Sequence, residues 1–213
     1  IVRSLVGSEM CIRDRTLGLL TPLVTIIGIL AGGWWTASTL ILALVVYPVL
    51  DFLLGDSSKT DSLEESRAFD FIVHTHGILV PVVIATLLYQ AYFDYNSFIW
   101  LAAVSVGLSS GASGIITAHE LGHRRPRSRS WWLSRLDLMC VLYLHFTVEH
   151  NHTHHKHWAK PRDPTSSPWK RNVYVHFIRT IPLQLMGAYR AKPKDFRYSM
   201  LILSLIHISE PTR

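Results

Sequence analysis

Residues 97–123 read SFIWLAAVSVGLSSGASGIITAHELGH, an apolar stretch that ends in two histidines four residues apart. The run from Ser97 to Ala118 contains no Asp, Glu, Lys or Arg. As a helix, about 20 such residues cross the roughly 30 Å hydrocarbon layer of a bilayer. The stretch therefore predicts a membrane-spanning helix that carries His119 and His123 at one end.

Three further apolar runs precede this stretch, and each is long enough to span. Residues 17–35 carry no charge, residues 38–55 carry only Asp51, and residues 71–93 carry none apart from any protonated histidine. A set of buried helices in a large soluble core is a poor explanation, because four such runs fall within about a hundred residues. The sequence predicts an all-α, polytopic integral-membrane helical bundle.

Lysines and arginines in the connecting loops predict which side of the membrane each loop faces, because cytoplasmic loops are enriched in both. The loop between the second and third runs carries Lys59 and Arg67, and four arginines follow the fourth run. The two other loops carry neither residue type. We therefore expect residues 56–67 and the segment after Ala118, with its histidine helices, to face the cytoplasm. The net charge of +6 is then explained by basic cytoplasmic loops that face anionic lipid. Nucleic-acid binding is not expected.

Two downstream stretches are expected not to cross the membrane. Residues 132–148 are apolar but short, contain Arg135 and Asp137, and are followed by a lysine- and arginine-rich segment. We expect them to form a helix packed under the bundle or lying in the interface. Residues 173–189 mix aromatic side chains with charge and are also expected to be interfacial. A further span is expected to begin near Tyr198.

Both ends of the chain resemble translated sequencing adaptor, with SLVGSEMCIRDR at 4–15 and SLIHISEPTR at 204–213. Foreign ends are set aside before a fold is inferred. Residues 1–15 and 204–213 are therefore interpreted as artefact, and residues 16–203 as one membrane domain from a parent protein truncated at both ends. Cys140 is then the only cysteine, so neither a disulfide framework nor a thiolate metal cluster is expected.

Eight of the twelve histidines fall between positions 119 and 157. In HELGH the two histidines are at i and i+4, so they lie on one helix face and can share a metal ion. The same pattern also marks zinc metalloproteases, in which the glutamate is the general base. EHNHTHH at 149–155 offers a second such pair, His150 and His154, and His155 is expected to point elsewhere, towards a second metal.

Five candidate nitrogen ligands exceed the three protein ligands of a zinc protease and suit two metal ions. Neutral imidazole binds iron, copper, zinc and nickel, and iron with nitrogen ligands and open positions can activate dioxygen. The candidate ligands are His119, His123, His150, His154 and His155.

TAHELGH at 117–123 and EHNHTHH at 149–155 resemble the first two histidine boxes of the membrane alkane monooxygenase family. DPTSS at 163–167 resembles the segment that follows the second box there. The family is part of a wider membrane di-iron group that includes fatty-acid desaturases and xylene monooxygenases. The first box has Glu-Leu-Gly between its two histidines, and the second box begins with Glu-His-Asn. Both features favour a hydroxylase over a desaturase.

This resemblance implies that residues 16–203 form a single membrane di-iron oxygenase domain that inserts one atom of dioxygen into a terminal C–H bond of an alkane. It implies two iron ions held by the five histidines, and a rubredoxin-type electron donor on the cytoplasmic side of a bacterial inner membrane. Glu120 and Glu149 are expected to accept hydrogen bonds from ligating imidazoles. Two further family motifs, NYxEHYG and HSDHH, have no match in the sequence, so the chain alone is expected to lack a complete site.

Two other functions stay open. One is a fatty-acid desaturase-like lipid oxygenase with a fatty-acyl substrate, and the other is a membrane zinc metalloprotease that uses HELGH. A centre with two irons would exclude the protease. The product separates the hydroxylase, which forms an alcohol, from the desaturase, which forms an alkene.

Six more polar residues are assigned weaker roles. His145 matches a histidine of the family, and Asp51 could support a ligand. Solvated or interfacial positions are expected for His74, His76, His152 and His157.

Overall fold

A computed structural model describes residues 18–54 and 67–208, and the described residues form helices and turns without a β-strand. The chain divides into two compact units, residues 1–140 and 141–213. The predicted all-α membrane fold is confirmed. The predicted artefact at residues 1–15 lies outside the described residues, and residues 204–208 belong to the last helix, α13.

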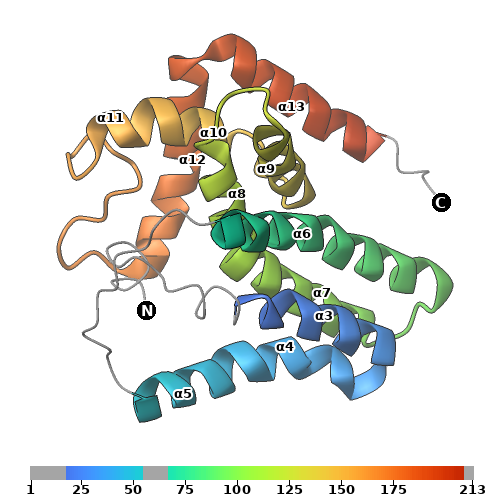
Figure 1. Ribbon diagram of the computed structural model, residues 1–213. Helices are drawn as coiled ribbons and strands as arrows, with labels where there is room; N and C mark the ends of the chain where they lie inside the picture. Colours follow the sequence, from blue (N-terminus) through green and yellow to red (C-terminus); the bar gives the residue numbers. More distant parts are fainter. Residues whose placement is uncertain (1–17, 55–66, 209–213) are drawn as a thin grey trace. The chain divides into compact units, whose positions relative to one another are not determined.

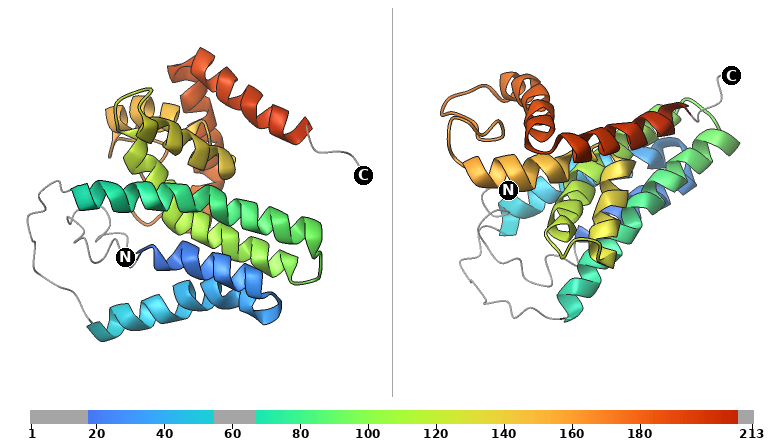
Figure 2. Two further views of the ribbon diagram at one scale, coloured as in Figure 1. Left: turned by 45° about the vertical axis from the view of Figure 1, so that its right-hand side comes forward. Right: turned by 90° about the horizontal axis from the view of Figure 1, so that it is seen from above.

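The first unit is a bundle in which α6 lies beside α3, α7 and α9 (Figures 1 and 2). Its first two apolar segments form a hairpin, and an antiparallel pair of long helices follows. The elements of the hairpin are α3 (Leu20–Ala31), η1 (Gly33–Ala37), α4 (Ser38–Ile41), η2 (Leu42–Val46) and α5 (Tyr47–Leu54). The later elements are α6 (Arg67–Phe93), α7 (Ile99–Ser109), η3 (Ser110–Gly114), α8 (Ile115–Gly122) and α9 (Arg129–Cys140).

Three helical stretches of the described residues are long and apolar enough to cross a membrane: Gly33–Leu54, Phe69–Phe93 and Ile99–Gly122. They match the second, third and fourth predicted spans. In the first predicted span, the described residues form α3 with 12 residues, and this helix ends where Gly32 adopts a φ of 71°. Glycine adopts backbone with a positive φ readily, because it has no Cβ.

The core of the first unit combines aliphatic packing with buried hydroxyl hydrogen bonds. Ile29, Val83, Ala102 and Val106 form its hydrophobic centre. Buried hydroxyls join α3 to α4 through Thr39 and Thr25, whose side-chain oxygens are 2.9 Å apart. Small polar residues of this kind hold helices together where lipid supplies no hydrophobic drive for association.

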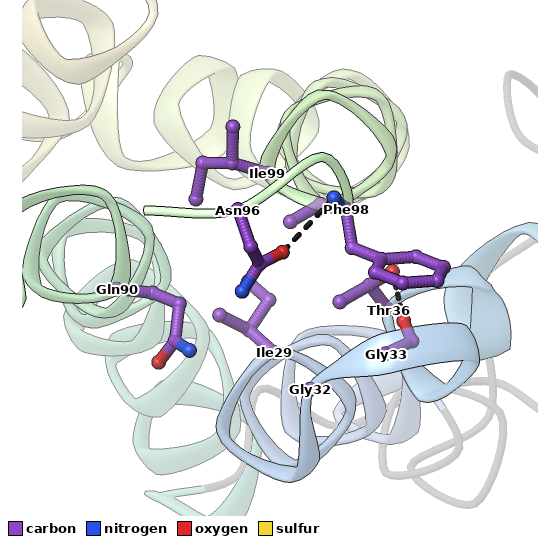
Figure 3. Close-up of a pocket in the computed structure, with 9 residues that line it drawn as sticks. Ile29, Gly32, Gly33, Thr36, Gln90, Asn96, Phe98 and Ile99 are labelled. Carbon is purple, nitrogen blue, oxygen red and sulfur yellow. Dashed lines mark hydrogen bonds between the residues drawn. The ribbon is translucent and has the colours of Figure 1, made fainter. Parts of the chain in front are cut away.

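A small cavity lies among the ends of α3, α6 and α7 (Figure 3). Its volume is about 10 Å³, which is about the space of one water molecule. Just before α7, the Asn96 side chain accepts a hydrogen bond from the backbone N–H of Phe98 at 2.9 Å. The cavity lies at the Ile99 end of the span 99–122, whereas HELGH lies at its other end, so this cavity does not form part of the histidine site.

The second unit consists of short helices followed by two long ones. A hydrogen bond from the Tyr143 hydroxyl to Gln184 fixes the segment before α10 onto α12. Neither α12 nor α13 has the length and composition of a candidate span within the described residues. The interfacial placement of residues 173–189 stays a prediction. The elements are α10 (Phe146–Glu149), η4 (His150–His154), α11 (His155–His157), α12 (Val173–Ala191) and α13 (Pro193–Ile208).

Candidate metal centre

The first histidine pair lies on the last turn of α8. His119 and His123 are one helical turn apart, and their Nε2 atoms are separated by 3.1 Å. Their rings meet edge to face, with centroids 4.6 Å apart. The prediction that these two side chains share one helix face is confirmed.

Contacts with α9 fix the backbone that carries this pair. The carbonyl of Ala118, directly before His119, accepts a 2.6 Å hydrogen bond from the buried Ser134 hydroxyl. Leu121 is fully buried in the same turn. A π-helical turn, Ser110–Gly114, comes just before α8, and such turns are frequent at functional sites because they change the register of the helix that follows.

Glu120 lies in an ion-pair network at the end of α8. Its Oε1 is 3.7 Å from the guanidinium of Arg124, which also donates to Asp70 of α6 at 2.8 Å. The Glu120 side chain is 45% exposed. A metalloprotease needs this glutamate as a general base beside its metal, whereas the observed contacts favour a role in tying α8 to α6.

The second histidine box contains a π-helical turn. Helix α10 continues into η4, where the backbone N–H of His155 bonds the carbonyl of His150. This i to i+5 pattern brings residues five apart onto one face, and the Nε2 atoms of His150 and His155 lie 3.0 Å apart. The expectation that His155 points away from this pair is wrong, because it assumed an α-helical register.

His154 turns its Nδ1 towards a buried carboxylate. That nitrogen is 2.9 Å from Asp163 Oδ2, and the Asp163 side chain is fully buried. Burial alone would raise the pKa of Asp163, but hydrogen bonds from Ser166 and Thr165 and the charge of His154 outweigh it and lower the pKa. Asp163 was not among the predicted site residues, although it begins the DPTSS segment.

His145 and Glu149 are buried one turn apart at the start of the second box. None of their ring nitrogens and carboxylate oxygens has a hydrogen-bond partner among the described residues. Burial lowers the pKa of His145 to about 4. Burial, and next the charge of Asp163, raise the pKa of Glu149 to about 7. Buried polar atoms normally have partners, so these atoms fit the surroundings of a bound group.

Three histidines with weaker expected roles contact hydroxyl groups or a backbone carbonyl. His74 contacts the Ser130 hydroxyl, His76 the Ser113 hydroxyl, and His152 the carbonyl of Val148 in its own helix. Asp51 is exposed near the end of α5. Glu149, expected to accept a hydrogen bond from a ligating imidazole, makes no such bond among the described residues.

Each histidine pair has the donor type and the spacing that one metal ion requires. Two metal–imidazole bonds of about 2.1 Å, set at about 90°, place their nitrogens about 3.0 Å apart. The observed separations are 3.1 Å in the first box and 3.0 Å in the second. Both pairs therefore fit metal-binding histidine boxes. Nitrogen donors suit iron as well as zinc, copper and nickel.

Comparison with known proteins identifies relatives of this chain. Residues 96–210, which include both boxes, match the fatty acid desaturase family. Alkane 1-monooxygenase 1 of Alcanivorax borkumensis is 32% identical over 183 residues, covering 80% of this chain and 43% of the relative. Alkane 1-monooxygenase of Pseudomonas putida is 32% identical over 182 residues, with the same coverage of each chain.

A third relative extends the same similarity. Alkane 1-monooxygenase of Ectopseudomonas oleovorans is 33% identical over 190 residues, covering 81% of this chain and 46% of the relative. The chain thus spans a little less than half the length of the curated relatives it matches. Both histidine boxes and the family match coincide in residues 96–210, and the chain belongs to the fatty acid desaturase family.

Proposed function

We propose that the protein is an integral-membrane alkane hydroxylase with a di-iron centre. The observation that carries this proposal is the pair of close Nε2 contacts, 3.1 and 3.0 Å, in the two box motifs of a chain similar to alkane 1-monooxygenases. The reaction consumes an alkane, dioxygen, two electrons and two protons, and it yields a primary alcohol and water. An external carrier must supply the electrons, and we propose a rubredoxin-type donor.

Five imidazoles are the proposed iron ligands in this chain. His119 and His123 form one pair and His150 and His155 the other, while His154 offers its Nε2 because its Nδ1 faces Asp163. When bound, iron supplies the activation of dioxygen that an unreactive C–H bond requires. The protein's part is to hold these nitrogens in place before the substrate arrives.

The two glutamates are proposed to support these ligands differently. Glu149 directly precedes His150, is 1% exposed, and has no hydrogen-bond partner among the described residues. Its carboxyl is therefore proposed to bond to a group at the centre. Glu120 is proposed to act through Arg124, by holding the end of α8 against α6.

We propose that the centre lies at the cytoplasmic end of the spans, in a bacterial inner membrane. The support is the arginine-rich loop that directly follows His123, together with the loop at Asp94–Asn96, which carries no lysine or arginine. An alkane dissolves in the hydrocarbon layer, so its terminal methyl can approach HELGH along the span Ile99–Gly122 without passing through water.

A fatty-acyl desaturase is the second candidate, and the family match is the observation that favours it. The similarity to alkane 1-monooxygenases favours the hydroxylase. Membership of this family also argues against the zinc metalloprotease that an isolated HELGH motif would allow.

The products distinguish these candidates. Membranes that contain the protein, expressed from its complete reading frame, are supplied with a reduced rubredoxin and either octane or a saturated fatty-acyl substrate. We expect 1-octanol from octane, and we expect the His150→Ala variant to form none while still inserting into the membrane. An alkene from the acyl substrate, without alcohol from octane, would assign the protein to the desaturases.

A further inference from the structure

We infer that Asp163 is a positioning residue for the metal centre, which fixes His154 in the tautomer that carries its proton on Nδ1 and leaves Nε2 free for a metal ion. The inference rests on the proposed function, because it takes His154 as a ligand. The Asp163 side chain is fully buried, and its Oδ2 lies 2.9 Å from the imidazole.

The hydrogen-bond directions around His154 determine where the ring proton lies. Nδ1 has two oxygen neighbours, Asp163 Oδ2 at 2.9 Å and Thr165 Oγ1 at 2.5 Å. An ionised carboxylate can only accept. The Thr165 hydroxyl donates its single proton to Asp163 Oδ1 at 2.7 Å, so it too presents only a lone pair to the ring. Nδ1 must therefore be the donor, and the neutral ring then has its free lone pair on Nε2.

The carboxylate is itself held by its own turn. Oδ1 accepts from the backbone N–H of Thr165 at 3.1 Å as well as from its hydroxyl, and Oδ2 accepts from Ser166 Oγ at 2.5 Å as well as from His154. Both oxygens are thus occupied, which leaves Asp163 poorly placed to bind metal directly. Its role is to orient the imidazole.

Two more contacts anchor this turn to its surroundings. Ser166 Oγ accepts from the backbone N–H of Ala159 at 3.0 Å, just after the second box. Thr180 of α12 donates its hydroxyl to the carbonyl of Pro164 at 2.9 Å. The acceptor for His154 is therefore tied to the turn after α11 on one side and to α12 on the other, which limits rotation of the ring.

His152 shows what a histidine of the same segment does without such an acceptor. Its Nδ1 lies 3.2 Å from the carbonyl of Val148, four residues earlier in the same helix, and its side chain is exposed. A carboxylate partner instead orients a ligating ring and raises its basicity, and removing such partners typically weakens metal binding by about 10–100-fold.

Cobalt(II) binding tests the inference without relying on turnover. The protein from its complete reading frame is stripped of metal in detergent and titrated with Co²⁺, with the visible absorption of the bound ion as the signal. We expect Asp163→Ala to raise the dissociation constant by about 10–100-fold and to change the absorption spectrum. Asp163→Asn, which keeps the size and a neutral acceptor, should lie between Asp163→Ala and the wild type.

Two further variants separate positioning from general damage. Ser166→Ala removes one bond to the carboxylate but leaves the acceptor of His154, so a smaller loss than in Asp163→Ala is expected. Asp195→Asn removes an exposed carboxylate of the same unit, which lies 3.7 Å from Lys192 Nζ, and should bind Co²⁺ as the wild type does. Circular dichroism checks that each variant keeps its helix content.

Wild-type Co²⁺ affinity in Asp163→Ala, with affinity lost in His154→Ala, would overturn the inference and leave the metal centre standing. Equal losses in Ser166→Ala and Asp163→Ala would also overturn it, because the turn and not the acceptor would then matter. Unchanged binding in His119→Ala, His150→Ala and His154→Ala would overturn the proposed metal centre together with the inference.

Discussion

His150 and His155 are five residues apart in the chain, yet their Nε2 atoms are 3.0 Å apart. The π-helical turn His150–His154 accounts for this approach, since it adds one residue to a helical turn. The pair is therefore placed by backbone geometry as well as by residue type. Its separation matches two nitrogens bound to one ion, and a shared ion would make the two side chains functionally dependent on each other.

That dependence predicts non-additive effects on metal binding. His150→Ala and His155→Ala should each weaken binding substantially, and the double variant should lose little more than either single one, because one missing ligand already disables the shared position. A coupling free energy of about 1–3 kcal/mol is expected from the double-mutant cycle. Co²⁺ titration measures it, with His152→Ala as the matched control, since that ring contacts a carbonyl of its own helix. Independent, additive losses would contradict a shared ion.

A buried carboxyl in α9 predicts a pH dependence of stability. Asp137 is 1% exposed, and burial raises its pKa to about 8 from an ordinary value of 3.8. A raised pKa stabilises the folded protein fully below the unfolded value, and this contribution is lost as the pH rises through about 8. The thermal midpoint in detergent should therefore fall by several degrees between about pH 5 and about pH 9.

Asp137→Asn should show a smaller fall over the same range, because an amide does not titrate. Asp195→Asn, an exposed carboxyl that pairs with Lys192, should keep the wild-type pH profile. Identical profiles for wild type and Asp137→Asn would show that this carboxyl is not the group responsible.

The sequence was sufficient to predict the spans, because a long uncharged run has few alternatives to a membrane helix. It also placed His119 and His123 correctly, since HELGH forms an ordinary α-helical turn. It did not predict the early end of α3, although the Gly32–Gly33 pair was a visible signal. In both glycines φ is positive, at 71° and 55°.

The second box was harder to predict, and the reason is physical. Residue spacing predicts a shared face only once the helix type is known, and the π-helical turn shifted His155 into the position expected for His154. Asp163 lies nine residues after His154, and a loop brings the two together. This contact depends on the turn at Thr165 and Ser166. Helical spacing rules do not apply to a turn, so they could not predict the contact.

Close packing at Gly28 predicts a stability loss. A Cβ at this position would lie 2.5 Å from the carbonyl oxygen of Trp35, and it would also meet the Ser38 hydroxyl. Gly28→Ala should lower the free energy of unfolding by about 1–3 kcal/mol, because backbone must move to admit the methyl group. Gly107→Ala is the matched control in another span, where a Cβ meets nothing within 4 Å. Thermal unfolding in detergent compares them, and equal midpoints would contradict the α3–α4 packing.

The proposed topology predicts opposite labelling of two loops. In a background in which Cys11 and Cys140 are both replaced by serine, Tyr95→Cys lies between α6 and α7 and Arg125→Cys lies between α8 and α9; both native side chains are exposed. A membrane-impermeant maleimide added to intact spheroplasts should label Tyr95→Cys, and should label Arg125→Cys only after lysis. The reverse pattern would place the first histidine box on the outer side.

The central claim is that the histidine boxes hold iron which activates dioxygen for alkane hydroxylation. The most direct test supplies octane and ¹⁸O₂ to the purified, iron-loaded protein from its complete reading frame, with reduced rubredoxin, and measures the isotope in 1-octanol by mass spectrometry. We predict one ¹⁸O atom per alcohol in the wild type and in His152→Ala, and no alcohol in His150→Ala, whose metal content should fall in parallel. Labelled alcohol at wild-type rates from His150→Ala, or 1-octanol whose oxygen comes from water, would contradict the account.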